Sequence, residues 1–386
     1  MAKPKFFITT TIPLTFIFFK GQPRLWKERY DVCAISSEFK NLKQFAEEEG
    51  IRFHHIPMKR EISLWSDAVN LLRWIWLLLK ERPCVVHGNT PKASMLSMLA
   101  AWMTRRPVRI YMCHGLRYQT TSGFLRKVLM FMEKVSCTCA NHVICVSEGV
   151  KEQLVKDGLC DKKKAKVIRY GTAGGVDIDY FSRKALDGGV DVRQQLGIER
   201  SAFVFCFVGR IVRDKGINEL VYAFNRLSAY NDSVHLILVG PSEDDLDPIT
   251  DETKSIISGN IRIHAVGRQA DVRPYLAASN AFVLPSYREG VGMVLLEANA
   301  MDVPCIASDI TGCRDVVEPM VNGELIPSKD EKALYEKMKE WVEHPEIVEM
   351  MALKCRDYVI SRYKKEDVAA AYFEEYKRLA RFEDAV

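Results

Sequence analysis

The sequence lacks the long hydrophobic run that a membrane-spanning helix requires. Such a helix needs about eighteen or more consecutive apolar residues, and no stretch of the 386-residue sequence supplies them. A GxGxxG motif after the first expected strand is also missing, which disfavours a dinucleotide-dependent dehydrogenase. We therefore expect no transmembrane helix and no oxidoreductase of that class.

Cysteine spacing does not fit a zinc site or a disulfide framework. The eleven cysteines are odd in number and irregularly spaced, which indicates free thiols in a reducing compartment. Cys137 and Cys139 flank one threonine, and no second pair or histidine spacing completes a zinc site. No acidic DxD pair stands at a strand end to hold a divalent cation. We expect no metal and no cofactor.

The N-terminus, MAKPK followed by FFITTTIPLTFIFF, resembles a signal peptide. Three features argue against that interpretation: no small-x-small cleavage site follows, the run contains three consecutive threonines and Pro13, and the cysteine usage is cytosolic. We expect residues 5–11 to form a buried strand, followed by a loop into a helix, and we expect a cytoplasmic protein.

Charge is unevenly distributed along the chain. Residues 1–170 hold 29 Lys and Arg against 14 Asp and Glu, a net charge of +15, whereas residues 171–386 carry −10. A basic half suggests an anionic partner, such as a membrane surface, a lipid phosphate or nucleic acid. The alternative is a chance segregation that only keeps the protein soluble.

Short apolar runs alternate with helical patterns along most of the chain. Because the runs are continuous rather than alternating, they predict strands covered on both faces, as in parallel sheets. The expected strands are 5–11, 30–36, 84–89, 108–115, 142–147 and 166–171, and then 203–210, 234–240, 261–267, 281–286 and 304–309. Two such series predict an α/β protein with two doubly wound domains, which we place at 1–182 and 183–362.

The stretch YREGVGMVLLEANAM, residues 287–301, contains two glutamates. On a helix, Glu297 shares its face with apolar residues, where an unpaired carboxylate is costly. It therefore either forms a structural ion pair or faces a cavity in which a ligand supplies hydrogen-bond donors. Glu289 precedes Gly290 and Gly292 in a loop entering the helix, and helix N-termini bind anions. The stretch suggests an anion at the helix N-terminus and a hydroxyl-bearing group at Glu297, as in a sugar nucleotide.

The stretch FVFCFVGRIVRDKGINEL places two cations at the end of one strand. Arg210 follows the last strand residue, Gly209, and Lys215 precedes a helix. Positive charge and backbone N–H donors together suit a diphosphate. The alternative is a solvated basic turn. Polar positions also follow three other expected strands, at 114–115, 267–268 and 286–292, the layout expected of a ligand cleft between two such domains.

Taken together, GRIVRDKG and LPSYREGVGMVLLEA resemble the retaining GT-B glycosyltransferases of family 4. The spacing Gly-Arg-four residues-Lys-Gly, followed by two glutamates eight positions apart, carries the likeness. HGNTPKASM, YMCHGLR, VICVSEGVKEQL and GGVDIDYF also match, so the resemblance covers nearly the whole chain. It implies two Rossmann-like domains, a donor nucleotide sugar held mainly by the second, and a final helix, 363–386, that packs back on the first.

The resemblance also implies roles for individual residues. Arg210 and Lys215 would bind the donor diphosphate, Glu297 the ribose, and Glu289 the transferred sugar. His114 would lie at the reacting sugar, although a lone histidine is often structural. The implied catalytic set is His114, Glu289, Arg210 and Lys215, and the remaining donor contacts are Gly209, Gly290, Val291, Gly292 and Arg268, the last stacked on the base.

The acceptor side follows from weaker signals. The stretches 71–80 and 124–135 are apolar with basic insertions, and they form either a membrane-facing surface or ordinary core helices. The chain resembles bacterial enzymes that build surface or capsular polysaccharide on a polyprenyl diphosphate. Candidate acceptor contacts are Gly21, Arg60, Lys92 and Arg117. The family often has paired glycines after its first strand, and here only Gly21 stands there.

Three hypotheses remain open at this point. The first is a metal-independent retaining glycosyltransferase that uses a UDP-sugar and a lipid-linked glycan acceptor at the inner face of the cytoplasmic membrane, with no nucleic acid partner. The second is a sugar-nucleotide 2-epimerase on the same fold, which would convert a donor without an acceptor. The third is a non-enzymatic, basic-faced module that binds membrane or nucleic acid.

Overall fold

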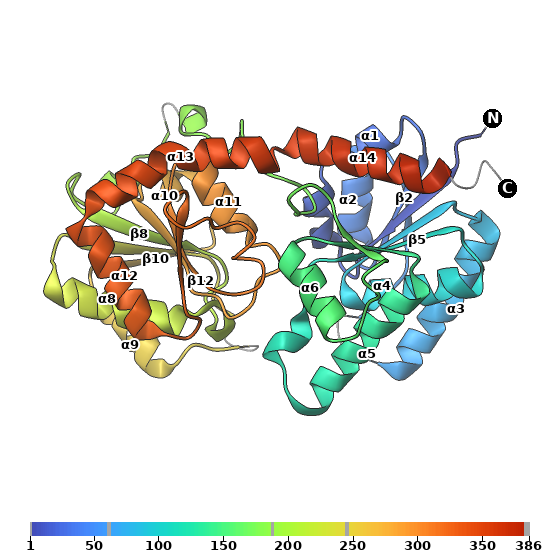
Figure 1. Cartoon of the computed structure of the whole chain (residues 1–386), viewed down its shortest axis with the longest axis horizontal. Helices are drawn as coiled ribbons and strands as arrows, with labels where there is room; N and C mark the ends of the chain where they lie inside the picture. The colour runs from blue at the N-terminus through green and yellow to red at the C-terminus, as the bar shows by residue number, and fades with distance from the viewer. Residues whose placement is uncertain (1, 60–62, 187–188, 244–246, 382–386) are drawn as a thin grey trace. The chain divides into compact units, whose positions relative to one another are not determined.

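A computed structural model of the chain describes residues 2–59, 63–186, 189–243 and 247–381. The chain forms two compact units, unit 1 from Met1–Gly175 and Lys365–Val386, and unit 2 from Val176–Lys364. Each unit has a parallel β-sheet with helices on both faces (Figure 1). The α/β class and the two doubly wound sheets predicted from the sequence are thereby confirmed.

Unit 1 contains a seven-stranded sheet in the order β3-β2-β1-β4-β5-β6-β7. Its strands are β1 (Lys5–Thr9), β2 (Asp31–Ser36), β3 (Arg52–His55), β4 (Val85–Asn89), β5 (Val108–Cys113), β6 (His142–Cys145) and β7 (Ala165–Val167). Its helices are η1 (Pro13–Phe19), α1 (Gln22–Trp26), α2 (Phe39–Glu49), α3 (Leu64–Glu81), α4 (Pro91–Met103), η2 (Arg117–Thr120), α5 (Gly123–Cys139), α6 (Glu148–Lys156) and α14 (Lys365–Arg381).

Unit 2 contains a six-stranded sheet in the order β10-β9-β8-β11-β12-β13. Its strands are β8 (Phe203–Val208), β9 (Val234–Val239), β10 (Ile263–Gly267), β11 (Ala281–Leu284), β12 (Cys305–Ser308) and β13 (Gly323–Ile326). Its helices are η3 (Arg183–Leu186), α7 (Val192–Gln195), η4 (Arg213–Lys215), α8 (Ile217–Tyr230), α9 (Asp251–Gly259), α10 (Arg273–Ala277), α11 (Met293–Ala300), α12 (Glu331–Glu343) and α13 (Pro345–Tyr363).

Two strands, β3 and β13, were not predicted from the sequence, and each lies at an edge of a sheet. The β3 sequence RFHH is only partly buried, and β13, GELI, carries a half-buried glutamate. An edge strand has a neighbour on one side only, so it needs no continuous apolar run. The expected strands, by contrast, include β4, all five residues of which are buried.

The boundary between the units lies earlier than the expected residue 182. Residues 176–182 belong to unit 2 because Arg356 on α13 donates hydrogen bonds to the backbone carbonyls of Ile178 and Phe181, both at 2.7 Å. The Val176 N–H also donates to the Tyr363 carbonyl at 2.8 Å. The second boundary falls between Lys364 and Lys365, where we had placed it before residue 363.

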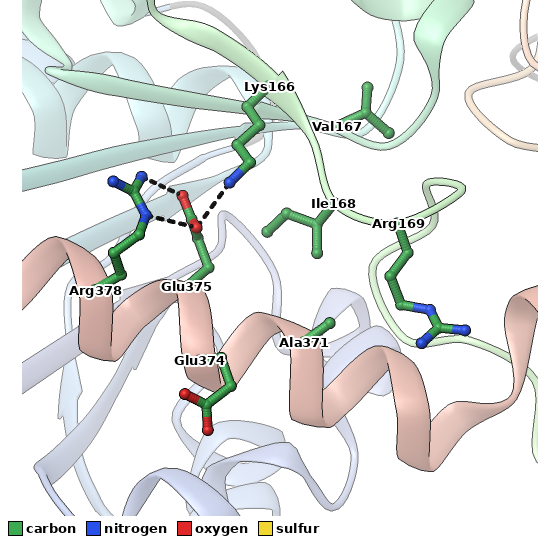
Figure 2. A pocket seen from close by; sticks show the side chains of 8 residues that line it. All are labelled: Lys166, Val167, Ile168, Arg169, Ala371, Glu374, Glu375 and Arg378. Atoms are coloured by element: carbon green, nitrogen blue, oxygen red, sulfur yellow. Dashed lines mark hydrogen bonds and ion pairs between the residues drawn. The ribbon is translucent and has the colours of Figure 1, made fainter.

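The last helix, α14, packs within unit 1. Tyr372 donates to the Thr172 carbonyl at 2.7 Å, and the carbonyl of Tyr376 accepts from Tyr30 at 3.1 Å. Beside β7 there is a hollow of about 490 Å³. It is lined by residues 166–169, which begin within β7, and by residues of α14 (Figure 2). There the Glu375 carboxylate accepts from Lys166 at 2.8 Å and from Arg378 at 2.8 and 3.0 Å. Two cations thus share one carboxylate, and the ion pair from Lys166 to Glu375 anchors α14 to β7.

Each sheet reverses its strand order once, between β1 and β4 in unit 1 and between β8 and β11 in unit 2. In doubly wound sheets, ligands bind beyond the carboxyl ends of the strands at this reversal. The loops that follow these four strands, together with the loop after β5, therefore carry the candidate sites.

Candidate functional site

Glycines bring the carboxyl ends of three neighbouring strands in unit 2 close together. The Gly209 N–H donates to the Val239 carbonyl, and the Gly240 N–H donates to the Gly267 carbonyl, both at 2.9 Å. A Cβ added at Gly240 would lie 1.7 Å from the Gly209 carbonyl oxygen, so no larger residue fits there. Arg210 and Arg268 follow two of these glycines and leave the sheet at the same edge.

Arg210 has an acidic partner in this structure. Its guanidinium donates to Glu243 at 2.7 Å, and both side chains are about one-third to two-fifths exposed. The exposure leaves the guanidinium accessible to another anion. Arg268 is also exposed, but no described contact joins it to Lys215 or Glu289, so its role at the base remains a prediction.

Gly216 positions Lys215 against the loop after β11. Its backbone has a left-handed φ of +71°, and a Cβ there would lie 2.1 Å from the Pro285 carbonyl oxygen. This close approach brings the Lys215 ammonium to 2.5 Å from one carboxylate oxygen of Glu289. Ser286 donates to the same oxygen at 2.7 Å. Lys215 and Glu289, predicted to act at one site, thus lie in direct contact.

The loop from Glu289 to Gly292 leads into helix α11. Gly292 occupies the N-cap position with a left-handed φ of +56°, and as a glycine it has no side chain with which to cap the helix. Val291 is buried, and the loop after β12 packs so closely that a Cβ at Gly312 would lie 2.6 Å from the Gly290 carbonyl oxygen. A closely packed loop that enters a helix N-terminus is a setting in which proteins bind anions, and the anion expected from the sequence stays a prediction.

Glu297 lies on α11, five residues after this N-cap. Burial raises the pKa of its carboxyl to about 7, and only part of the side chain reaches solvent. Over residues 2–59, 63–186, 189–243 and 247–381, no hydrogen bond or ion pair to the Glu297 carboxylate is found. The structural ion pair that the sequence left open is therefore not formed within these ranges, and the ligand with hydroxyl donors stays a prediction.

His114 lies in unit 1, directly after β5. Its ring Nε2 lies 3.0 Å from Asn89 Oδ1, at the end of β4. The ring of Phe18 stacks on it at 5.6 Å, and Phe19 approaches edge-on at 6.0 Å. Burial lowers the pKa of His114 to about 4, so the imidazole is neutral at pH 7.

The four candidate acceptor contacts have different surroundings. The Gly21 N–H donates to the Glu49 carboxylate at 2.9 Å, which already engages it. Lys92 is buried, and its ammonium lies 2.9 Å from the Asp67 carboxylate, so our expectation of a lysine presented to an acceptor does not match this structure. Arg117 is exposed on η2. Arg60 lies outside the described residues.

Three hydrogen-bonding or ion-pairing partners of the candidate side chains were not predicted from the sequence: Asn89, Asp67 and Glu243. Asn89 ends a strand and could have been found by that position, whereas Ser286, which contacts Glu289, lies in the polar stretch 286–292 that was expected. Asp67 and Glu243 carry no such signal, because their pairing with Lys92 and Arg210 depends on the packing of distant segments.

Within residues 2–59, 63–186, 189–243 and 247–381, no cluster of three His, Cys, Asp or Glu could hold a metal ion.

Exposed apolar side chains are concentrated on helix α3 of unit 1. Its exposed residues Trp65, Val69, Leu72, Trp76 and Leu79 recur every three or four positions, which places them on one face. Trp65 is 84% exposed and Trp76 is 61% exposed. Helix α4 packs against α3 and also against α5, which exposes Phe124, Leu125 and Phe131. We call the five exposed apolar residues of α3 the apolar face.

Among the helices of the described residues, none is sufficiently long and apolar to cross a membrane.

Comparisons with known proteins identify relatives of the whole chain. Two family models match, Glycosyltransferase Family 4 over residues 23–173 and Glycosyl transferases group 1 over residues 191–357. The capsular polysaccharide biosynthesis glycosyltransferase CapM of Staphylococcus aureus is 33% identical, covering 95% of each chain. The UDP-Gal:alpha-D-GlcNAc-diphosphoundecaprenol alpha-1,3-galactosyltransferase of Escherichia coli is 28% identical, covering 87% of this chain and 86% of that protein.

A solved structure of HepE from Anabaena in complex with UDP has the same fold. It matches with a TM-score of 0.79 and 20% identity, covering 98% of this chain and 100% of HepE. The likeness confirms the predicted GT-B fold with its two Rossmann-like domains.

Proposed function

The chain belongs to the group 1 and family 4 glycosyltransferases, and we propose that it transfers a sugar with retention from a UDP-sugar to a polyprenyl-diphosphate-linked glycan. The reaction would serve the synthesis of bacterial surface or capsular polysaccharide. Family membership favours glycosyl transfer over the epimerase and the non-enzymatic binding module that the sequence left open.

One observation carries the proposal for the donor: Lys215, Glu289 and the N-terminus of α11 converge at the β8–β11 reversal. A nucleoside diphosphate leaves as an anion, so the reaction needs its growing negative charge stabilised more than it needs a proton donor. Lys215 and Arg210 supply positive charge, and the backbone N–H groups of the α11 N-terminus supply hydrogen bonds.

Glu289 and Glu297 would bind the two sugars of the donor. Lys215 now holds Glu289, and a diphosphate that binds Lys215 competes with this contact. The released carboxylate then accepts hydrogen bonds from hydroxyls of the transferred sugar. Glu297, whose carboxylate has no partner in the described ranges, accepts from the ribose hydroxyls. In this proposal the carboxylates bind the sugar hydroxyl groups, while the cations bind the diphosphate.

The proposed acceptor rests on the relatives and on the apolar face. The Escherichia coli relative is named for an acceptor on diphosphoundecaprenol. A lipid-linked acceptor resides in a membrane, so an enzyme that uses it must approach the lipid surface. The apolar face, with exposed Arg73 and Lys80 beside it, suits the interface of an anionic membrane. We propose peripheral attachment to the inner face of the cytoplasmic membrane through unit 1.

The first test is thermal unfolding with UDP, GDP, ADP and their sugars, each with and without EDTA. We expect selective stabilisation by UDP and UDP-sugars, about 2.7 kcal/mol at a ligand concentration of one hundred Kd, and no effect of EDTA. A Glu297→Ala variant should lose most of the shift. If no nucleotide stabilises the protein, the donor site is not assembled as proposed; loss of the shift in EDTA would refute metal independence.

The second test addresses the acceptor and the stereochemistry. Sugars on polyprenyl diphosphate should accept the transferred residue, whereas the same sugars without the lipid should accept it poorly. The anomeric configuration of the product, measured by NMR, should match that of the donor. An inverted product would refute retention, and equal use of lipid-free sugars would refute the lipid-linked acceptor.

A further inference from the structure

A chain of buried polar groups joins the last helix of unit 1 to His114. The Tyr376 hydroxyl on α14 lies 3.4 Å from His87 Nε2, and His87 Nδ1 lies 3.0 Å from Asn89 Nδ2. Asn89 Oδ1 then lies 3.0 Å from His114 Nε2. Tyr376, His87 and Asn89 are fully buried, so water does not compete for these hydrogen bonds.

The surroundings of Asn89 determine the orientation of its side-chain amide. Its Nδ2 lies 3.2 Å from the Thr9 carbonyl oxygen, which can only accept a hydrogen bond. The NH₂ group must therefore face Thr9 and His87, and the amide oxygen must face His114. Because that oxygen can only accept, His114 must carry its proton on Nε2.

The tautomer decides what the other ring nitrogen can do. A neutral imidazole protonated on Nε2 presents Nδ1 as a hydrogen-bond acceptor. The ring of Phe18 stacks on the His114 imidazole and the ring of Phe19 contacts it edge-on, so both rings restrict its orientation. His87 is the titratable group that interacts electrostatically with His114, and within the described ranges no carboxylate or ammonium is hydrogen-bonded or ion-paired to the His114 ring.

We propose that Asn89 is a positioning residue that fixes His114 as the Nε2–H tautomer, so that Nδ1 is presented as a hydrogen-bond acceptor to a sugar hydroxyl. The inference rests on the proposed function for the sugar, but the tautomer itself does not. A purely structural Asn89 would support the end of β4 without affecting which nitrogen of His114 carries the proton.

The experiment is NMR of ¹⁵N-labelled histidine rings in the full chain, with the His114 signals assigned by their loss in His114→Gln. In the wild type we expect the Nε2–H tautomer throughout pH 6–8. Asn89→Asp keeps an acceptor oxygen but adds a negative charge, which should raise the pKa of His114 above that in the wild type. Asn89→Leu should give a mixture of tautomers. Asn41→Asp, an exposed change of equal charge in unit 1, should leave the ring signals unchanged.

The wild-type spectrum alone can overturn the proposal, so the test does not depend on the variants folding. An Nδ1–H tautomer or a tautomer mixture in the wild type refutes it, as does a wild-type spectrum for His114 in folded Asn89→Leu. With a UDP-sugar and a lipid-linked acceptor, kcat should fall severalfold in Asn89→Leu, in proportion to the lost fraction of the Nε2–H tautomer, while the donor KM changes little. If no sugar is transferred by any variant or by the wild type, the proposed function fails, while the tautomer result still stands by itself.

Discussion

The ammonium of Lys215 lies 2.5 Å from a carboxylate oxygen of Glu289, although 74 positions separate the two residues in the sequence. The contact is largely shielded, since their side chains are only 20% and 15% exposed. It joins the loop after β8 to the loop after β11, on the two sides of the point where the strand order reverses. The pair therefore couples the proposed diphosphate contact to the proposed sugar contact.

Replacing Lys215 with methionine should remove the charge while keeping most of the side-chain length. We expect kcat to fall by roughly 10²–10³-fold, because a donor aimed at the leaving group is lost. Stability should fall by only about 1–2 kcal/mol, since Ser286 still donates to Glu289. Lys332→Met, an exposed lysine on α12, is the control and should behave like the wild type. An unchanged kcat in Lys215→Met would falsify the diphosphate role.

Glu297→Gln should stabilise the protein at high pH and weaken donor binding. The folded pKa of about 7 exceeds the ordinary value of 4.5. The folded state therefore binds the proton more tightly, and stability declines as pH rises from 4.5 to 7. The glutamine variant should avoid that decline and gain on the order of 1–3 kcal/mol at pH 8, with little difference at pH 4.5. Denaturant unfolding at both pH values measures this.

The same carboxylate should make donor binding pH-dependent. The ionised form accepts hydrogen bonds from ribose hydroxyls better than the protonated form, so affinity for UDP-glucose should rise through pH 7 in the wild type. Glu297→Gln should bind about 1–3 kcal/mol more weakly at pH 8 and show a flat profile. Equal calorimetric affinities of the two proteins at pH 8 would remove the ribose assignment.

The double variant Trp65→Glu, Trp76→Glu should lose membrane binding. Burial of a large apolar side chain is worth about 1.5–3 kcal/mol, so sedimentation with vesicles rich in anionic lipid should weaken by at least about tenfold. The control Ile261→Glu, Leu353→Glu makes the same changes at exposed apolar positions of unit 2 and should bind normally. Binding should also weaken with salt. If vesicle binding changes neither with salt nor with the tryptophan substitutions, the apolar face is not the membrane-binding surface.

Glu375→Gln should weaken the packing of α14 at neutral pH, and the difference from the wild type should disappear at low pH. Burial alone would raise the pKa of Glu375, but hydrogen bonds from Arg378 and Lys166 outweigh it and hold the pKa at about 2 (Figure 2). Its stabilisation is therefore present above pH 4.5 and is lost as pH falls toward 2. We expect a loss of about 1–2 kcal/mol at pH 7, reduced because both cations are half exposed.

The neighbouring Glu374 offers a matched control for this prediction. It is 68% exposed and pairs with Lys377 one turn along the same helix. Glu374→Gln should cost little at any pH, because exposed pairs contribute little. Equal unfolding profiles for the two variants would show that the Glu375 network does not anchor the helix.

Several features of this protein follow from the sequence by itself. Continuous apolar runs predicted the buried parallel strands, because a strand covered on both faces has no polar side. The spacing of Arg210, Lys215, Glu289 and Glu297 predicted loops and a helix N-terminus at strand ends. These are local properties, determined by residues a few positions apart, and they are sufficient to place the donor residues on their elements.

Only the tertiary structure decided which charges meet. The residues next to Lys92 in the sequence do not indicate that its side chain is buried and paired with Asp67. Those next to Lys215 do not indicate its contact with Glu289. The edge strands β3 and β13 and the contact between Asn89 and His114 likewise depend on packing. Hydrophobic periodicity specifies which face of an element is buried, whereas an ion pair or hydrogen bond between distant segments requires the register and packing of whole sheets. The physical state of each candidate side chain is therefore a property of the folded chain.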